Sequence, residues 1–159
     1  MAEQLWFLRH GEAEPHDARP DDRRRLTERG ERQSRAAGRA LAALELTFQH
    51  VATSPRVRAL DTARLACEAL DGCQPVVHDE LSKGFDAEDA IAIAHAVRPD
   101  RRVLLIGHNP DFAQVLHDLT GARVDLKKGG IAAVRLDGRR GTLIMLLRPR
   151  EIDRLAGPG

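Results

Sequence analysis

The chain has 159 residues, of which 25 are Lys or Arg and 24 are Asp or Glu, and aromatic residues make up 3%. A length of this order suits one domain, so we expect a single domain over residues 1–159. The near balance of charges excludes a broad basic field for nucleic acid or an anionic membrane, and the scarcity of aromatic side chains excludes a base-stacking platform. Any function that depends on charge must therefore be local.

The cellular compartment is predicted from the start of the chain, its apolar runs and its cysteines. No apolar run reaches membrane-spanning length, and Glu3 stands where a signal peptide needs a basic start. Cys67 and Cys73 match neither a Cys-x-x-Cys redox pair nor a metal framework. We therefore expect a cytoplasmic protein that holds two reduced structural thiols and has no membrane partner.

Apolar residues recur along the chain with the spacing of strands and of amphipathic helices in alternation. The predicted strands cover residues 4–8, 50–53, 75–78, 102–106, 131–136 and 142–147. The predicted helices cover residues 27–44, 55–70, 86–97 and 110–119, with a short one after Pro149. Alternating strands and helices imply parallel strands with crossovers, and the polar turn at 137–141 predicts a final hairpin. We expect an α/β three-layer sandwich: a mostly parallel central sheet, helices on both faces and a C-terminal antiparallel hairpin.

Two helix starts repeat one pattern, because Ser54 and Asn109 each precede a proline. We interpret both residues as N-caps, with the proline in the first helical position. Gly121 is predicted to end the helix that begins at Pro110. Residues 12–25 carry two prolines, five acidic residues and four arginines, which is typical of a solvated rim loop rather than a core element.

Basic and imidazole side chains follow three of the predicted strands. Arg9 and His10 end the first strand, Ser54 with the arginines after it ends the second, and His108 follows the fourth. Because ligands bind at the carboxyl ends of parallel strands, we expect these groups to meet. Two imidazoles and at least two guanidiniums in one place need an anion, and phosphate matches the fork of arginine donors. Like charge should also lower the pKa of His10 and keep it a neutral nucleophile.

Three stretches resemble one known family. Residues 9–12, Arg-His-Gly-Glu, are similar to the R-H-G-[DE] signature of the histidine phosphatase superfamily. Residues 54–63 resemble its second block, S-x-x-x-R-A-x-x-T-A, and residues 107–110 resemble its third. The length and the short connections look most like the SixA-type phosphohistidine phosphatases, with a phosphoglycerate mutase-like fold.

The resemblance implies a role for each matching residue. His10 would take the phosphoryl group, while three other residues would hold its oxygens: Arg9, Arg58 and His108. Four further residues would contribute to substrate binding: Gly11, Ser54, Arg56 and Asn109. Gly11 would let the backbone pass close to the phosphate. The resemblance implies no metal and no organic cofactor.

A glutamate that serves larger members of the family as general acid is replaced here. Lys83 occupies the usual position, and Glu80 and Asp86 are the other candidates for a proton donor. Without an acid an alkoxide leaves slowly, whereas the imidazole of phosphohistidine departs readily because its nitrogen protonates near neutral pH. The expected substrate is therefore phosphohistidine on a phosphoprotein, such as a histidine-containing phosphotransfer domain.

Three alternatives stay open at this point. The same fold could serve as a phosphatase of small phosphorylated metabolites, or the pocket could bind phosphate without turnover. His10, Glu12 and His16 also form an H-x-E-x3-H pattern, with Asp17 as a further ligand, that would suit a metallohydrolase. The oligomeric state and any closure of the 12–25 loop over the substrate are not predicted.

Overall fold

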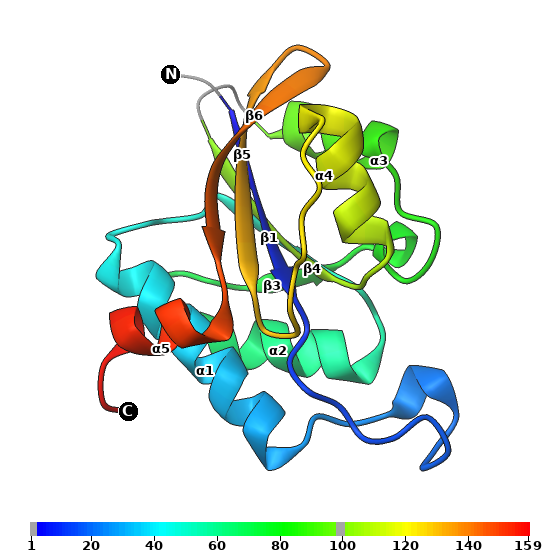
Figure 1. The fold of residues 1–159 in the computed structure, drawn as a ribbon, viewed down its shortest axis with the longest axis vertical. Coiled ribbons are helices and arrows are strands. Elements are labelled where there is room, and N and C mark those ends of the chain that lie inside the picture. The colour runs from blue at the N-terminus through cyan, green and yellow to red at the C-terminus, as the bar shows by residue number, and fades with distance from the viewer. Residues whose placement is uncertain (1–2, 98–100) are drawn as a thin grey trace.

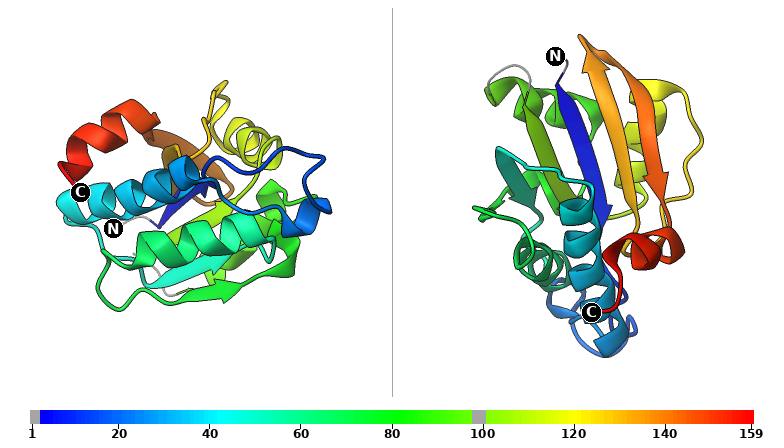
Figure 2. Two further views of the ribbon diagram at one scale, coloured as in Figure 1. Left: turned by 90° about the horizontal axis from the view of Figure 1, so that it is seen from below. Right: turned by 90° about the vertical axis from the view of Figure 1, so that its left-hand side faces the viewer.

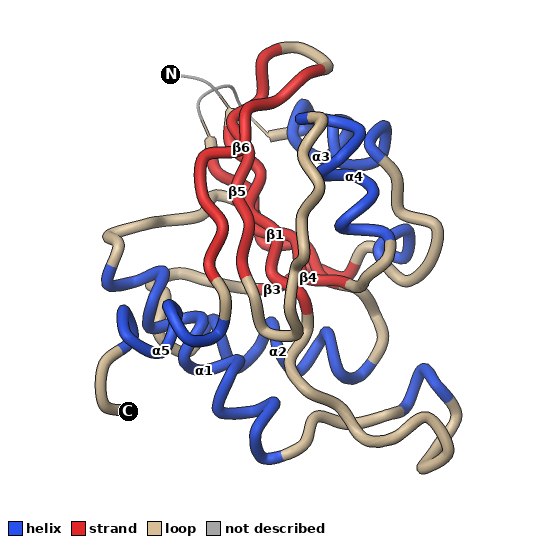
Figure 3. Tube along the Cα trace, in the orientation of Figure 1, coloured by secondary structure: helices blue, strands red, loops and turns tan. Residues whose placement is uncertain are grey.

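The computed structural model describes residues 3–97 and 101–159. Met1 and Ala2, where a signal peptide would begin, lie outside the described residues. Six strands form one sheet in the order β3-β2-β4-β1-β5-β6 (Figures 1 and 3). They are β1 (Gln4–Arg9), β2 (His50–Thr53), β3 (Pro75–Val77), β4 (Arg102–Gly107), β5 (Ile131–Asp137) and β6 (Arg140–Leu147). The first four run parallel, while β5 is antiparallel to both β1 and β6. The predicted α/β fold with its C-terminal hairpin is confirmed.

Helices cover both faces of the sheet (Figure 2). On one face lie α1 (Glu28–Ala43), α2 (Val57–Cys67) and α5 (Pro149–Ala156), and on the other α3 (Ala87–Ala96) and α4 (Asp111–Thr120). Two short 3-10 helices, η1 (Asp21–Arg23) and η2 (Asp79–Leu81), lie in the connections. None of the helices in the described ranges is long and apolar enough to cross a membrane.

The central strands divide their side chains between two cores. In β1, Leu5 and Phe7 belong to the core under α3 and α4, whereas Trp6 and Leu8 belong to the core under α1, α2 and α5. This alternation follows from the two-residue period of a strand. A strand covered on both faces needs apolar residues at every position, which explains its continuous apolar run.

Two of the predicted helix starts are wrong. The N-cap of α2 is Arg56, and Ser54 lies two residues earlier, where its Oγ accepts a hydrogen bond from the Arg56 amide at 3.2 Å. The N-cap of α4 is Pro110, and the Asn109 side chain instead donates to the carbonyl of Leu126 at 3.1 Å. Both polar side chains are used in tertiary contacts, which local capping patterns do not reveal. Gly121 does end α4, with a left-handed φ of 79°.

The prediction of two reduced thiols is also wrong, because Cys67 and Cys73 form a disulfide in the structure. Cys67 is the last residue of α2, and the chain then turns back through Gly72, whose φ is 66°. This turn brings the two Cα atoms to 5.1 Å, within the range that a disulfide spans. Spacing rules for redox and metal pairs do not detect a tight turn of this kind.

Candidate active site

The carboxyl ends of three parallel strands meet at one edge of the sheet. Arg9, the last residue of β1, pairs with Gly107 at the end of β4, and Thr53 of β2 pairs with Ile106 of the same strand. The residues that follow these strand ends leave the sheet together: His10, Ser54 and His108. The loop from β1 to α1 passes the same edge (Figure 3). The structure therefore brings these groups together at one edge of the sheet, as expected from the sequence.

A pocket of about 240 Å³ lies at this edge. The four residues expected to handle the phosphoryl group all line it: Arg9, His10, Arg58 and His108. Arg56 and Asn109 line it as well, together with Asp21, Arg24, His16 and Lys128. Its walls therefore carry far more positive than negative charge.

His10 is held as a neutral imidazole. Its ring is 6% exposed, and Nδ1 lies 2.7 Å from the carbonyl oxygen of Gly11. Because a carbonyl only accepts, Nδ1 carries the proton and Nε2 keeps its lone pair. Burial, which has the largest effect, and the charges of Arg58, Arg9 and Lys128 together lower the pKa of His10 to about 3. The like charge predicted from the sequence therefore adds to a larger effect of burial.

His108 faces the same pocket beside His10. The two ring centroids are 5.2 Å apart, and Nε2 of His108 lies 2.8 Å from the hydroxyl of the fully buried Ser54. Burial lowers the pKa of His108 to about 2, helped by His10 and the arginines. Ser54 is thus placed to orient His108 rather than to line the pocket.

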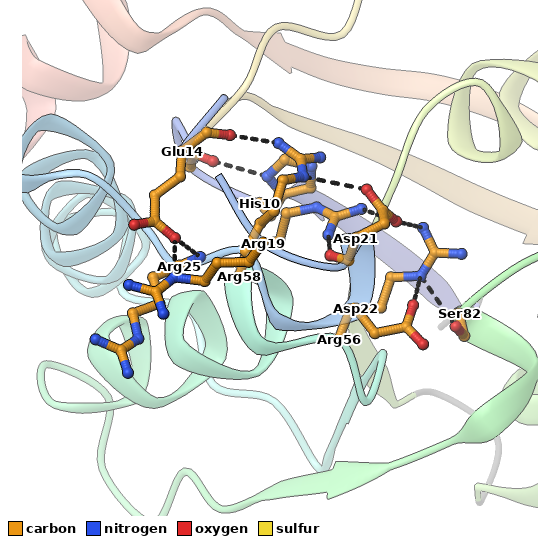
Figure 4. A network of polar contacts seen from close by, with 11 residues as sticks. His10, Glu14, Arg19, Asp21, Asp22, Arg25, Arg56, Arg58 and Ser82 are labelled. Atoms are coloured by element: carbon orange, nitrogen blue, oxygen red, sulfur yellow. Dashed lines mark hydrogen bonds and ion pairs between the residues drawn. The ribbon is translucent and has the colours of Figure 1, made fainter. Parts of the chain in front are cut away.

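Asp21 of η1 is a pocket residue that the sequence analysis missed (Figure 4). Arg58, which is 3% exposed, donates from Nη1 to the backbone oxygen of Asp21 at 2.7 Å and from Nη2 to its carboxylate at 3.2 Å. Arg56 reaches the same carboxylate oxygen at 3.0 Å, and Arg24 donates to the other oxygen at 3.1 Å. Although burial raises it, the pKa of Asp21 is lowered overall by Arg58 and Arg24. Asp21 is therefore an ionised carboxylate, and only the acidic pair after Pro20 hinted at it.

Several buried polar atoms at this edge have no partner among the described residues. They are Nε of Arg9, Nε of Arg58, Nδ1 of His108 and Oδ1 of Asn109. Nη1 of Arg9, by contrast, donates to the carbonyl of Leu126 at 2.9 Å, so the guanidinium is held in place. Oδ1 of Asn109 is an acceptor, whereas the guanidinium nitrogens are donors; buried donors without acceptors are costly, and an oxyanion would supply the acceptors. The residues present fit a tetrahedral anion such as phosphate.

Gly11 is not among the residues that line the pocket, and its backbone packs against α1 and α2. Its amide donates to Oγ1 of Thr62 at 3.1 Å, and a Cβ at this position would lie 2.5 Å from the carbonyl oxygen of Gly30 in α1. Glycine is needed here because α1 approaches the backbone closely. Gly11 therefore fixes the position of His10 against α1.

Neither expected carboxyl candidate for a general acid lines the pocket. Glu80 contacts Nδ1 of His78 at 3.2 Å, and Asp86 caps α3 by accepting from the Asp89 amide at 2.9 Å. Ser82, next to Lys83, accepts a hydrogen bond from Nε of Arg56 at 3.1 Å. Among the residues that the structure describes, Asp21, which is ionised, is thus the one carboxylate that lines the pocket.

The H-x-E-x3-H pattern does not gather at one point. The carboxylate of Glu12 accepts from Oγ1 of Thr27 at 2.7 Å and borders a neighbouring groove, whereas His10 and His16 line the pocket. Across the ranges that the structure describes, no group of three or more His, Cys, Asp or Glu residues is arranged to hold a metal ion.

A mostly parallel α/β sheet thus carries, at the carboxyl ends of its strands, a positively charged pocket lined by two neighbouring histidines and by arginines. The family model of the histidine phosphatase superfamily (branch 1) matches residues 5–84, half of the chain. The chain belongs to this superfamily, and its structure is of the SixA type.

Individual relatives are similar to this chain over most of its length. An uncharacterized protein of Picosynechococcus sp. is 32% identical over 144 residues, which are 86% of this chain and 87% of the relative. The structure of the protein histidine phosphatase SixA complexed with tungstate is similar, with a TM-score of 0.83, 26% identity, and coverage of 94% of this chain and 99% of that one. A putative phosphohistidine phosphatase SixA from Agrobacterium tumefaciens has the same fold, with a TM-score of 0.79, 22% identity and coverage of 94% and 99%.

Proposed function

We propose that the protein hydrolyses phosphohistidine on a phosphoprotein, with His10 as the nucleophile. The observation that carries the proposal is the state of His10. Its Nδ1–H is bound by the Gly11 carbonyl, so a neutral Nε2 with a free lone pair remains in a pocket of unsatisfied donors. The similar SixA structure holds tungstate, a tetrahedral oxyanion like phosphate, which supports the same kind of ligand here.

In the first step Nε2 of His10 attacks phosphorus in line with the leaving nitrogen. The new N–P bond forms on His10 as the N–P bond of the substrate breaks, and the electron pair of that bond stays on the departing imidazole, which takes a proton from water. Arg9, Arg58 and His108 hold the three equatorial oxygens. When the Ser54 hydroxyl donates to Nε2 of His108, the proton of this ring lies on Nδ1. Nδ1 of His108 has no hydrogen-bond partner among the described residues, so it is the atom that would donate to a phosphoryl oxygen.

In the second step water attacks the phosphorus bound to His10. The N–P bond breaks, inorganic phosphate leaves, and the lone pair returns to Nε2 of His10. The arginines keep their positions throughout, since Arg9 is held by Leu126 and Arg58 by Asp21. Donors that do not have to reorganise stabilise the charge that develops on the phosphoryl oxygens.

The leaving group decides between phosphohistidine and a phosphate ester. An alkoxide needs a proton donor, but the pKa of Asp21 is lowered by its arginine partners, so this carboxylate is ionised at neutral pH. An imidazole leaving group protonates near neutral pH without such a donor. The pocket therefore favours a phosphoramidate substrate.

Phosphate release from a phosphohistidine peptide and from glycerol phosphate, an ester whose alkoxide leaving group needs a proton, tests the proposal. We expect kcat/KM to be higher for the peptide by at least about 100-fold, the size of effect that a general acid supplies for esters. His10→Ala should lower the peptide rate by more than about 1000-fold, while His117→Ala, at an exposed position of α4, serves as the control. Faster turnover of esters than of the peptide, or a His10→Ala protein of normal rate, would refute the proposal.

A further inference from the structure

We propose that a basic groove beside the pocket binds a carboxylate-rich segment of the phosphoprotein substrate, an inference that rests on the proposed function and narrows its substrate class. The groove has a volume of about 520 Å³ and lies where the first turn of α1, the loop before β5 and the first turn of α5 meet. Six cationic residues line it: Arg9, Arg29, Lys127, Lys128, Arg148 and Arg150.

The positive charge of the basic groove exceeds what its acidic neighbours balance. Glu12 supplies a carboxylate to the lining, 4.0 Å from Arg29. Outside the lining, Asp125 pairs with Lys127 at 2.9 Å, and Glu151 pairs with Arg148 at 2.9 Å. Even with these three carboxylates included, the six cations are only half balanced. In a chain whose formal net charge is +1, such an excess marks one face for an anionic ligand.

The basic groove adjoins the pocket, because Arg9 and Lys128 line both. The wall between them is held by the backbone, since the amide of Gly129 donates to the carbonyls of Arg9 and His10 at 3.0 Å and the amide of Arg9 donates to the carbonyl of Gly130 at 3.1 Å. One ligand can thus place its phosphoryl group against His10 and its neighbouring residues along the groove.

The exposure of the cations favours a protein segment over a small metabolite. The side chains of Arg29 and Arg150 are 67% and 77% exposed, so they line an open surface rather than an enclosed ligand site. A second hollow along α1 shares Arg29 with the groove and is lined by Arg32 and Arg39; Arg35, which also lines it, is paired with Glu31 and Glu68, and Asp153 adds a carboxylate to the lining. An extended chain with several carboxylates matches this length of surface, and charge complementarity of this kind fixes partner choice.

The test compares two phosphohistidine peptides that differ only beside the phosphorylated residue, where one carries a run of glutamates and the other a run of glutamines. The groove variant is Arg29→Glu combined with Arg150→Glu. Both positions lie in the first turn of a helix, where an acidic residue is favourable. The control is Arg135→Glu combined with Arg140→Glu, at exposed positions of β5 and β6, which changes the net charge equally at the end of the sheet away from the pocket.

At low salt we expect the protein to favour the glutamate peptide by about tenfold in kcat/KM, a preference that salt reduces. The groove variant should lose this preference and keep its turnover of p-nitrophenyl phosphate, whereas the control should keep both. Equal kcat/KM for the two peptides, or a preference that survives in the groove variant, would overturn the inference. So would faster turnover of a small bisphosphorylated metabolite than of either peptide.

Hydrolysis of the glutamine peptide tests the proposed phosphohistidine phosphatase activity independently of the basic groove. If neither peptide releases phosphate, the proposed function fails, and the groove is judged by competition instead. The unphosphorylated glutamate peptide must then inhibit hydrolysis of p-nitrophenyl phosphate by the protein and by the control but not by the groove variant. Absence of that difference would overturn the inference.

Discussion

Asp21 places a carboxylate against the guanidinium that is proposed to hold the phosphoryl group. Its backbone carbonyl fixes one nitrogen of Arg58, while its carboxylate meets both Arg58 and Arg56. The backbone contact orients Arg58, but the carboxylate charge competes with an incoming anion. One residue therefore has two separate effects: its backbone positions Arg58, and its side chain lowers the affinity of the pocket for an anion.

We predict that Asp21→Asn tightens binding of inorganic phosphate. The variant keeps the backbone contact with Arg58 and loses the charge, so the inhibition constant of phosphate should fall by about three- to tenfold, as expected for one partly exposed charge a few ångströms away. The inhibition constant is measured by competition against p-nitrophenyl phosphate. Asp22→Asn is the matched control, because Asp22 is exposed and lies 3.5 Å from Arg56. An unchanged or larger constant in Asp21→Asn would show that the carboxylate does not compete.

Strand and helix positions could largely be predicted because their signals are local. β1 and β4 have apolar residues at every interior position, and the polar residues that end or follow them mark the strand ends that form the site. Asp21 and the Cys67–Cys73 disulfide could not be predicted, since a loop without periodicity and a tight turn are positioned by tertiary contacts. Ser54 and Asn109 were assigned to the correct edge, but their expected capping roles were replaced by contacts across the fold.

The start of α1 is fitted closely to the end of β1. A Cβ at Gly30 would collide with the backbone carbonyl of Glu12. A Cβ at Gly11 would in turn lie 2.5 Å from the backbone carbonyl oxygen of Gly30. Thr27 accepts from the Gly30 amide at 3.1 Å and so fixes where the helix begins. At the scale of the elements, the start of α1 therefore helps to fix the position of His10 at the end of β1.

We predict that Gly30→Ala lowers the free energy of unfolding by about 1–3 kcal/mol, the usual cost of overpacking. Helix propensity alone would raise it by about 1 kcal/mol, so the sign of the change distinguishes the two effects. The variant should also lower kcat/KM, because backbone that must move carries His10. Urea denaturation measures the change, with Arg32→Ala on the exposed face of α1 as the control. A stabilised Gly30→Ala protein would contradict the close contact.

At the scale of the whole molecule, two apolar cores on opposite faces of one sheet leave the strand ends as the place where polar groups gather. The fold buries His10 and His108 there as neutral rings, in a chain whose formal net charge is +1. Burial of these rings makes the stability of the entire fold depend on pH.

In the folded protein burial lowers the pKa of His10 to about 3 and that of His108 to about 2, against about 6.5 in the unfolded chain. Below pH 6.5 the unfolded chain therefore binds more protons than the folded one, so stability that is fully present above pH 6.5 is lost as the pH falls toward these values. Between about pH 7.5 and pH 5 each ring should account for a loss of about 2 kcal/mol. Urea denaturation at both pH values measures it, and His10→Gln should lose about 2 kcal/mol less than the protein, whereas His117→Gln should lose as much. An equal loss in His10→Gln would mean that the pKa of His10 is the same in the folded and the unfolded chain, so that burial does not keep the ring neutral below pH 6.5.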